Sequence, residues 1–573
     1  KFHRVFFAFL CVKKLHNSNI FLIFTTYLYI RTYFIMKKLL FISIIAFGFQ
    51  SIIAQETTRR DTLQGGLRFE RTCFDVQRYN LDIQVLPRTK KIEGNNEIIF
   101  KVVDNTSKIQ IDLFENMQID SIVWNTKKLT YKREFDAVFV KFPSELPKGS
   151  TQNIKIYYQG NPKVAKNAPW DGGFVFSKDK KEMPWIGVAV QGTGASLWYP
   201  VKDTQTDEPD NGASVKVAVP DGLMNVSNGR FLGSEKLANN FTRWDWEVKN
   251  PINTYNITLN IGDYVHIHDN HNGLDLDYYV LRENEEKARK HFEDDVKPML
   301  DCFQSKFGKY PFWEDGYKLV ETPYLGMEHQ SAVAYGNKYK KGYMGFDMSG
   351  TGVGMKFDYI TIHETGHEWF GNSITSKDIA DMWIHEGFTT YTETVFVECT
   401  QGYDAAMKYI NGQSKNVRND KPIIGQFGVN REGSGDMYYK GSLLLNTLRH
   451  VVNNDTKWWA ILLKYSETYK KQIIDTPTVI AFFNAETGRN LTPIFNQYLN
   501  YKSIPQLEIK GYKNRFQYRW KTEEPNFEMP VDIMIGDKKV RLNATNEWKK
   551  AGEVIASFED LKVLTDQFYI KAN

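Results

Sequence analysis

Apolar and polar residues alternate over much of the chain between residues 74 and 265. The alternation comes in short runs bounded by turn-forming residues, and one such run contains Val215, Val217 and Val219. A period of two is typical of a half-buried strand, because successive side chains of a strand point to opposite faces of the sheet. The pattern therefore predicts an N-terminal β domain, which we assign to residues 55–265.

The periodicity changes after this first domain. A charged amphipathic helix is predicted over 284–307, and helical patterns, interrupted by a short strand at 317–320, continue to about Tyr501. Alternation returns beyond that point. The chain is therefore predicted to be a multidomain α+β protein. Its second domain is mainly helical with a small β-sheet and its third is a small β-sandwich-like domain, over 266–504 and 505–573.

The charge of the chain is unevenly distributed. The chain has 573 residues, too many for one hydrophobic core, and a formal net charge of +5. Residues 1–54 carry seven Lys/Arg and no Asp/Glu, so the rest of the chain has a net charge of −2. Because the positive charge belongs to the first segment, nucleic-acid binding loses its compositional support.

A segment with the features of a secretory signal begins at Met36. Two lysines follow Met36, then an apolar stretch over 39–49 and a plausible cleavage site at 51–54, before Gln55. We expect translation to start at Met36, and the protein to be exported, periplasmic or extracellular, with no stable membrane anchor after cleavage. The alternative is a transmembrane anchor, but the apolar runs at 21–35 and 39–53 are short for one.

Three cysteines follow the predicted cleavage site: Cys73, Cys302 and Cys399. They lie far apart in the sequence, which matches neither the disulfide framework of a small secreted domain nor a CxxC zinc module. We expect buried free thiols, although one pair is possible in an exported protein and the sequence does not select it.

The clearest candidate chemistry lies in residues 361–393, TIHETGHEWFGNSITSKDIADMWIHEGFTTYTE. His363 and His367 are four residues apart, which on a helix places both imidazoles on one face. We expect this helix to end near Gly371 and a second helix to bring in Glu386, after eighteen intervening residues. Two histidines and one carboxylate suit a catalytic zinc ion, one per chain, because a fourth coordination position stays open.

Glu364 lies between the two histidines, and its side chain is expected to point beside the metal rather than at it. A carboxylate in that place takes a proton from water, as a general base does. HExxH alone is a weak signal, since buried helical histidines are common, and the distant Glu386 strengthens it.

These residues resemble the signature of the M1 family of zinc aminopeptidases, the gluzincins. That signature is HExxH, eighteen residues, and a glutamate in a WxxEG context, which here is the stretch from Trp383 to Gly387. The resemblance implies a thermolysin-like catalytic domain, Zn²⁺ as the cofactor, and peptides with free N-termini as substrates. It is a resemblance to the exported bacterial type that lacks the family's large helical C-terminal domain.

The same resemblance implies an amine-binding site. Glu328 stands where the family's GxMEN motif has its amine-binding glutamate, and Gly326 and Met327 fit that motif. Leu325 and His329 depart from it, since the family has Gly and Asn there, and this leaves the geometry at the scissile bond open. We nevertheless place His329 among the substrate-binding residues, with Gly326, Met327 and Glu328. A strand at this position is expected to be an edge strand that pairs with an extended peptide.

Two further residues are implied by the resemblance. Gln191, nine residues before Pro200, matches the family position that contacts the substrate's first residue and its amine. Tyr438 is the first residue of a YxKG-like motif, in which the tyrosine stabilises the oxyanion with the zinc. The alternatives are a glutamine that only satisfies a turn and a tyrosine packed in the core, with Tyr439 as the adjacent candidate.

The sequence thus predicts a zinc aminopeptidase that hydrolyses the N-terminal peptide bond of peptides. One alternative is a zinc endopeptidase of the same superfamily, which needs an open cleft and no ammonium site; Glu328 argues against it. Another is a peptide-binding protein with a silent metal site. Such a protein needs neither the base Glu364 nor the oxyanion donor Tyr438.

Overall fold

The structure is a computed structural model that describes residues 57–573 apart from Lys513. Residues Arg59–Asn573 form one compact unit. The predicted signal segment, 36–54, lies outside the described residues and stays a prediction. Within the described range, no helix is both long and apolar enough to cross a membrane.

An N-terminal β part follows two short helices, α2 (Arg59–Gly65) and α3 (Phe69–Thr72). Its largest sheet has eight strands in the order β13 (Arg230–Leu237), β14 (Phe241–Val248), β11 (Ala213–Pro220), β1 (Phe74–Leu86), β2 (Lys91–Val102), β8 (Thr151–Gly160), β4 (Met117–Trp124) and β5 (Lys127–Lys128). The predicted alternation in β11 is confirmed, because Val215, Val217 and Val219 are all buried in the core.

Two smaller sheets complete this β part. Their strand orders are β3 (Thr106–Asp112), β7 (Ala137–Leu146), β6 (Thr130–Glu134), and β12 (Met224–Val226), β15 (Asn260–Gly262), β10 (Pro184–Ala189), β9 (Gly173–Lys178). Buried residues from all three sheets join one hydrophobic cluster. The loop that follows β10 carries Gln191, so this β part contributes a candidate site residue.

The helical part begins with a five-stranded sheet. Its order is β16 (Tyr264–His271), β17 (Leu274–Leu281), β18 (Tyr317–Glu321), β20 (Val333–Tyr335) and β19 (Gly326–Met327). Because β16 starts at Tyr264, the sheet begins two residues before the predicted boundary at 266. β19 lies at the edge of the sheet and ends directly before Glu328, so the strand expected there is an edge strand.

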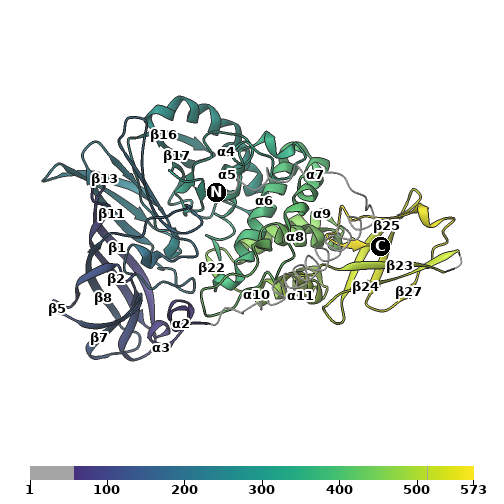
Figure 1. Ribbon diagram of the computed structural model, residues 1–573, viewed down its shortest axis with the longest axis horizontal. Helices are drawn as coiled ribbons and strands as arrows, with labels where there is room; N and C mark the ends of the chain where they lie inside the picture. The colour runs from purple at the N-terminus through teal and green to yellow at the C-terminus, as the bar shows by residue number, and fades with distance from the viewer. Residues whose placement is uncertain (1–56, 513) are drawn as a thin grey trace, which may run out of the picture. The chain divides into compact units, whose positions relative to one another are not determined.

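The helices of this part are α4 (Glu285–Phe307), α5 (Tyr359–Gly366), α6 (Trp383–Gln401), α7 (Tyr403–Gln413), α8 (Tyr439–Val452), α9 (Asp455–Thr468), α10 (Thr476–Thr487) and α11 (Thr492–Leu499). A short two-stranded sheet pairs β21 (Ile374–Ser376) with β22 (Gln472–Ile474). The helix α6 is buried on every side from residue 383 to residue 397. It contacts α4, α5, α7 and α8, and Figure 1 shows α5, α6 and α8 next to one another. A helix that is buried all round lies at the centre of its domain.

The expectation of free thiols is wrong for two of the three cysteines. Cys302 of α4 and Cys399 of α6 form a disulfide, while Cys73 is free and buried. The sequence could not select this pair because the two cysteines are 97 residues apart and meet only when α4 packs on α6.

The C-terminal part consists of two small sheets. Their strand orders are β27 (Lys549–Lys550), β24 (Arg515–Lys521), β23 (Gln506–Tyr512), β29 (Lys571–Ala572), and β26 (Lys538–Thr545), β25 (Glu528–Ile535), β28 (Leu561–Val563). Trp520 and Val531 lie in the same buried cluster as residues of the helical part, so the C-terminal part packs against it. The predicted α+β class, with β parts on either side of a helical one, is confirmed.

Candidate active site

The helix α5 presents both histidines of the HExxH motif to one place. Asp358 caps this helix, since its side chain accepts a hydrogen bond from the backbone N–H of Thr361. The α-helix ends at Gly366, earlier than the predicted end near Gly371, but His367 keeps a right-handed helical backbone (φ −62°, ψ −22°). The two imidazole rings therefore lie one turn apart, with 5.0 Å between their centroids.

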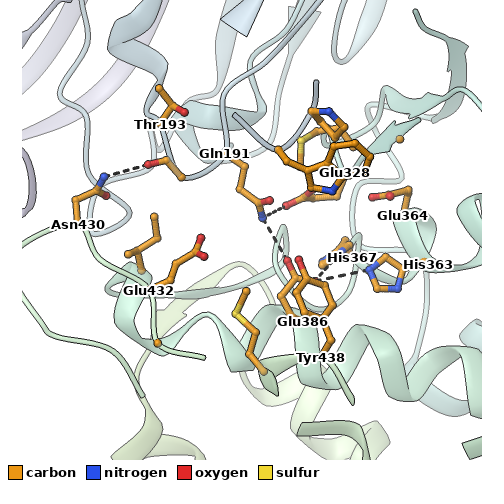
Figure 2. A pocket seen from close by; sticks show the side chains of 18 of the residues that line it. Gln191, Thr193, Glu328, His363, Glu364, His367, Glu386, Asn430, Glu432 and Tyr438 are labelled. Atoms are coloured by element: carbon orange, nitrogen blue, oxygen red, sulfur yellow. Dashed lines mark hydrogen bonds and ion pairs between the residues drawn. The ribbon is translucent and has the colours of Figure 1, made fainter. Parts of the chain in front are cut away.

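Glu386 completes a cluster of three candidate metal ligands. Its Oε2 lies 3.3 Å from Nε2 of His367 and 3.7 Å from Nε2 of His363, and all three side chains are buried. Figure 2 shows the three side chains converging on one point. Glu386 stands in the first turn of α6, where the helix dipole favours a carboxylate.

The orientation of these groups fits a zinc ion. Nδ1 of His363 lies 2.7 Å from Oε1 of Glu393, and Nδ1 of His367 lies 3.0 Å from the carbonyl oxygen of Phe370. Because both acceptors need a proton on Nδ1, each Nε2 presents its lone pair to the cluster. Oε2 of Glu386 is buried and accepts no hydrogen bond from any residue that the structure describes, as expected of a metal ligand atom. Two imidazole nitrogens and one carboxylate oxygen are a zinc donor set.

Glu393 is a candidate functional residue that we did not identify from the sequence. It lies seven residues after Glu386, two turns along α6, so both carboxylates face α5. Its other oxygen, Oε2, accepts hydrogen bonds from Tyr409 (2.7 Å) and Gln413 (2.8 Å). The helical spacing of seven was the signal that could have found it.

Glu364 lies beside the cluster formed by His363, His367 and Glu386, as Figure 2 shows, and is not one of these three ligands. Gly326 explains how its side chain fits. A Cβ at Gly326 would come within 2.8 Å of both Oε1 of Glu364 and Cγ2 of Ile360, so a side chain there would displace this carboxylate. Burial raises the pKa of Glu364 to about 7, which is a useful value for a group that exchanges protons near neutrality.

Glu328, directly after β19, is buried and held by residues of the N-terminal β part. Gln191 Nε2 donates a hydrogen bond to its Oε1 (2.5 Å), and so does the hydroxyl of Tyr255 (2.9 Å). The same Gln191 nitrogen lies 3.5 Å from Oε1 of Glu386. Gln191 thus links the two carboxylates across the boundary between the domains, and Tyr255 is a second contact that the sequence did not reveal.

The two residues that depart from the GxMEN motif, Leu325 and His329, do not line the cavity. His329 is buried, does not line the cavity, and has no hydrogen-bond partner at Nδ1 among the described residues. Burial lowers its pKa to about 3, so it is neutral, and its position away from the cavity lining gives no support to its place among the substrate-binding residues. Leu325 packs against the core of the helical part.

Tyr438, not Tyr439, faces the site. It is the N-cap residue of α8 and lines the cavity, with its ring 6.1 Å from that of His363, whereas Tyr439 does not line the cavity. Burial and the nearby Glu386 raise the pKa of Tyr438, which keeps the phenol protonated as a donor. Its helix lies against α6 because Gly387 and Gly441 touch: a Cβ on Gly441 would come within 2.9 Å of Cα of Gly387.

The candidate metal ligands line one cavity together with Glu364, Glu328 and Tyr438, and its volume is about 530 Å³. Of the residues assigned from the sequence, it is lined by Gln191, Gly326, Met327, Glu328, His363, Glu364, His367, Glu386 and Tyr438. Its other walls come from the loops around 169–170, 192–193 and 421–437.

Two family models match the chain. The model described as the peptidase family M1 domain covers residues 293–498, and the one described as the peptidase M1 N-terminal domain covers residues 76–256. The chain belongs to peptidase family M1. Both matched regions contribute to the cavity, because Gln191 lies in the second and the metal ligands lie in the first.

Relatives within this family include aminopeptidases. Aminopeptidase N of Lactobacillus helveticus is 23% identical over 347 residues, which cover 58% of this chain and 38% of that protein. Endoplasmic reticulum aminopeptidase 1 of Mus musculus is 23% identical over 267 residues, which cover 44% of this chain and 28% of that protein. The chain therefore matches less than half the length of these relatives.

The fold is also that of a solved relative. The M1 zinc metallopeptidase from Deinococcus radiodurans matches with a TM-score of 0.62 and 19% identity, over 77% of this chain and 95% of that one.

The hydrogen bond from His363 to Glu393 generates a prediction about metal affinity. Glu393→Gln keeps the shape of the side chain but removes the charge that holds the imidazole proton. We expect the affinity for zinc to fall about 10- to 100-fold while the fold is retained. Competition with a chromophoric chelator measures this, with circular dichroism as the control for folding. An affinity equal to that of the wild type would show that Glu393 does not support the ligand.

Proposed function

We propose that this protein is a zinc-dependent aminopeptidase that removes the first residue of peptides. The observation that carries the proposal is the position of Glu328. Its carboxylate lies in the same cavity as the metal ligands, and its oxygen lies within 4.8 Å of the nearest donor atoms of Glu364 and His367. A peptide whose reacting carbonyl is at the metal then has its α-amino group next to Glu328.

Several features support Glu328 as the binding site of an ammonium group. The hydrogen bonds that its carboxylate accepts from Gln191 and Tyr255 both reach Oε1, which leaves Oε2 available. Burial raises the pKa of Glu328, so an added positive charge stabilises the carboxylate form. A buried, charge-assisted hydrogen bond of this kind contributes about 1.5–3 kcal/mol.

The remaining residues supply the chemistry of hydrolysis. His363, His367 and Glu386 would hold the zinc ion, which would supply a Lewis acid for the carbonyl and lower the pKa of a water molecule. Glu364 takes a proton from the attacking water and delivers it to the leaving amine. The hydroxyl of Tyr438 donates a hydrogen bond to the oxyanion. The edge strand β19 offers backbone groups to which an extended peptide binds.

Loss of the base and loss of the oxyanion donor should both slow catalysis without removing the metal. We expect Glu364→Gln to lower kcat by about a hundredfold or more, because an amide cannot accept the proton of water. Tyr438→Phe should also lower kcat, and Tyr439→Phe is the matched control because that ring lies outside the cavity. Metal content and kcat are measured together. A larger effect of Tyr439→Phe would contradict the assignment.

The contact of Glu328 with the amino group separates an aminopeptidase from an endopeptidase. We expect the wild type to cleave free peptides in preference to N-acetylated ones, and a chelator to abolish the activity. Glu328→Ala should lose most of kcat/KM on free peptides and nearly all of this discrimination. Efficient internal cleavage of acetylated peptides by the wild type would favour the endopeptidase instead, and peptide binding without cleavage would favour the silent metal site.

We also propose that the protein is exported. The support is the signal-like segment from Met36 to Ala54 together with the disulfide between Cys302 and Cys399, since disulfides are rare in reducing compartments. Protein purified from the exported fraction of an expressing bacterium should begin at Gln55, as determined by mass spectrometry of the intact chain. Recovery only from the cytosol, with the leader retained, would refute this.

A further inference from the structure

One carboxylate in the cavity has no part in the chemistry proposed so far. Glu432 lines the cavity, and Figure 2 shows its side chain on the side of Gln191 and Asn430, away from Glu364. Among the described residues, no hydrogen bond or ion pair is recorded for its carboxylate. An acidic group that points into a substrate cavity without a partner is a candidate for binding a positive charge.

The loop that carries Glu432 is fixed at several points, so the carboxylate has a defined place. The backbone N–H of Gly428 donates to Asp378 (2.8 Å), and Nδ2 of Asn430 donates to the carbonyl of Gly192 (3.0 Å). The neighbouring Arg431 forms an ion pair with Asp61 of α2 at 3.2 Å. These contacts come from three separate parts of the chain.

The position of Glu432 relative to the amine site defines which part of a substrate it meets. Oε1 of Glu432 lies 3.5 Å from the place of a Cβ on Gly192, the residue after Gln191. Gln191 itself donates a hydrogen bond to Glu328, so Glu328 and Glu432 both lie against the turn at residues 191–192. With the α-amino group at Glu328 and the leaving amine at Glu364, the remaining part of the cavity is open to the first side chain of the peptide, and Figure 2 shows Glu432 there, away from Glu364.

The surroundings of Glu432 suit a long side chain with a cationic end. Ile379, Met437 and Trp170 line the same cavity and offer apolar surface to a methylene stem. Lys421 also lines the cavity but forms no recorded ion pair with Glu432. The side chain of Glu432 is exposed to solvent, yet partial desolvation by the cavity walls and the negative charge of Glu386 raise its pKa, so a cation at this position is favoured.

We infer that Glu432 makes the enzyme select peptides whose first residue is lysine or arginine. Such a residue carries two positive charges, one for Glu328 and one for Glu432. This inference rests on the proposed aminopeptidase function and adds a substrate class to it.

The test uses three aminoacyl amides with the same leaving group: lysine, Nε-acetyl-lysine and norleucine. Acetylation keeps the length of the lysine side chain and removes its charge. The wild type should prefer lysine over both others in kcat/KM. In Glu432→Gln, the ratio of lysine to acetyl-lysine should fall about tenfold, the value of one charge-assisted contact in a partly hydrated site. Glu286→Gln, which removes an exposed charge on α4 outside the cavity, is the matched control and should leave the ratio unchanged.

Two further variants give opposite expectations. Lys421→Gln removes a competing cation and should raise the lysine ratio, whereas Glu432→Lys should make the enzyme prefer glutamate over lysine. If all three substrates are cleaved with ratios that Glu432→Gln does not change, the inference is overturned while the aminopeptidase function stands. If no free aminoacyl amide is cleaved by the zinc-loaded wild type, the proposed function itself fails.

Discussion

The site depends on the burial of two carboxylates on one helix. Glu386 and Glu393 stand two turns apart on α6, which is enclosed on all sides in its first four turns. Buried charges are costly unless they are paired and hydrogen-bonded. Here Nδ1 of His363 binds Glu393 from one side, while Tyr409 and Gln413 bind it from the other. Glu386 faces Nε2 of both histidines, where a zinc ion would neutralise its charge. The relative position of α5 and α6 is therefore an electrostatic requirement as much as a matter of packing.

The packing of α8 on α6 extends this constraint to Tyr438. The contact between Gly387 and Gly441 leaves no room for a side chain at either position, so the two backbones approach closely. Lys440, the lysine of the YxKG-like motif, faces away from the cavity and donates hydrogen bonds to the carbonyls of Tyr501 and Lys502. The motif thus combines one residue for the site with two that hold the helix in place.

The proposed recognition of the substrate's N-terminus depends on the N-terminal β part as well as on the helical part. Gln191 and Tyr255 belong to the N-terminal β part, yet both bind Glu328 of the helical part. The loop with Glu432 contacts α2, the Gly192 turn and Asp378 at the same time. The metal centre is built within one domain, while the selectivity that we propose comes from contacts between domains.

The sequence by itself determined what repeats locally: the strands with a period of two, the extent of α4, and the ligand set His363, His367 and Glu386. Side-chain direction along one helix or strand follows from backbone geometry, so such patterns are readable without a fold. Tertiary structure alone decided which distant groups meet. It paired Cys302 with Cys399 and brought Glu393 within hydrogen-bond distance of His363. It also left His329 outside the cavity lining and brought Glu432 beside Gly192, the residue after Gln191. These outcomes depend on how whole elements pack, which is the sum of many weak contacts that no short stretch of sequence encodes.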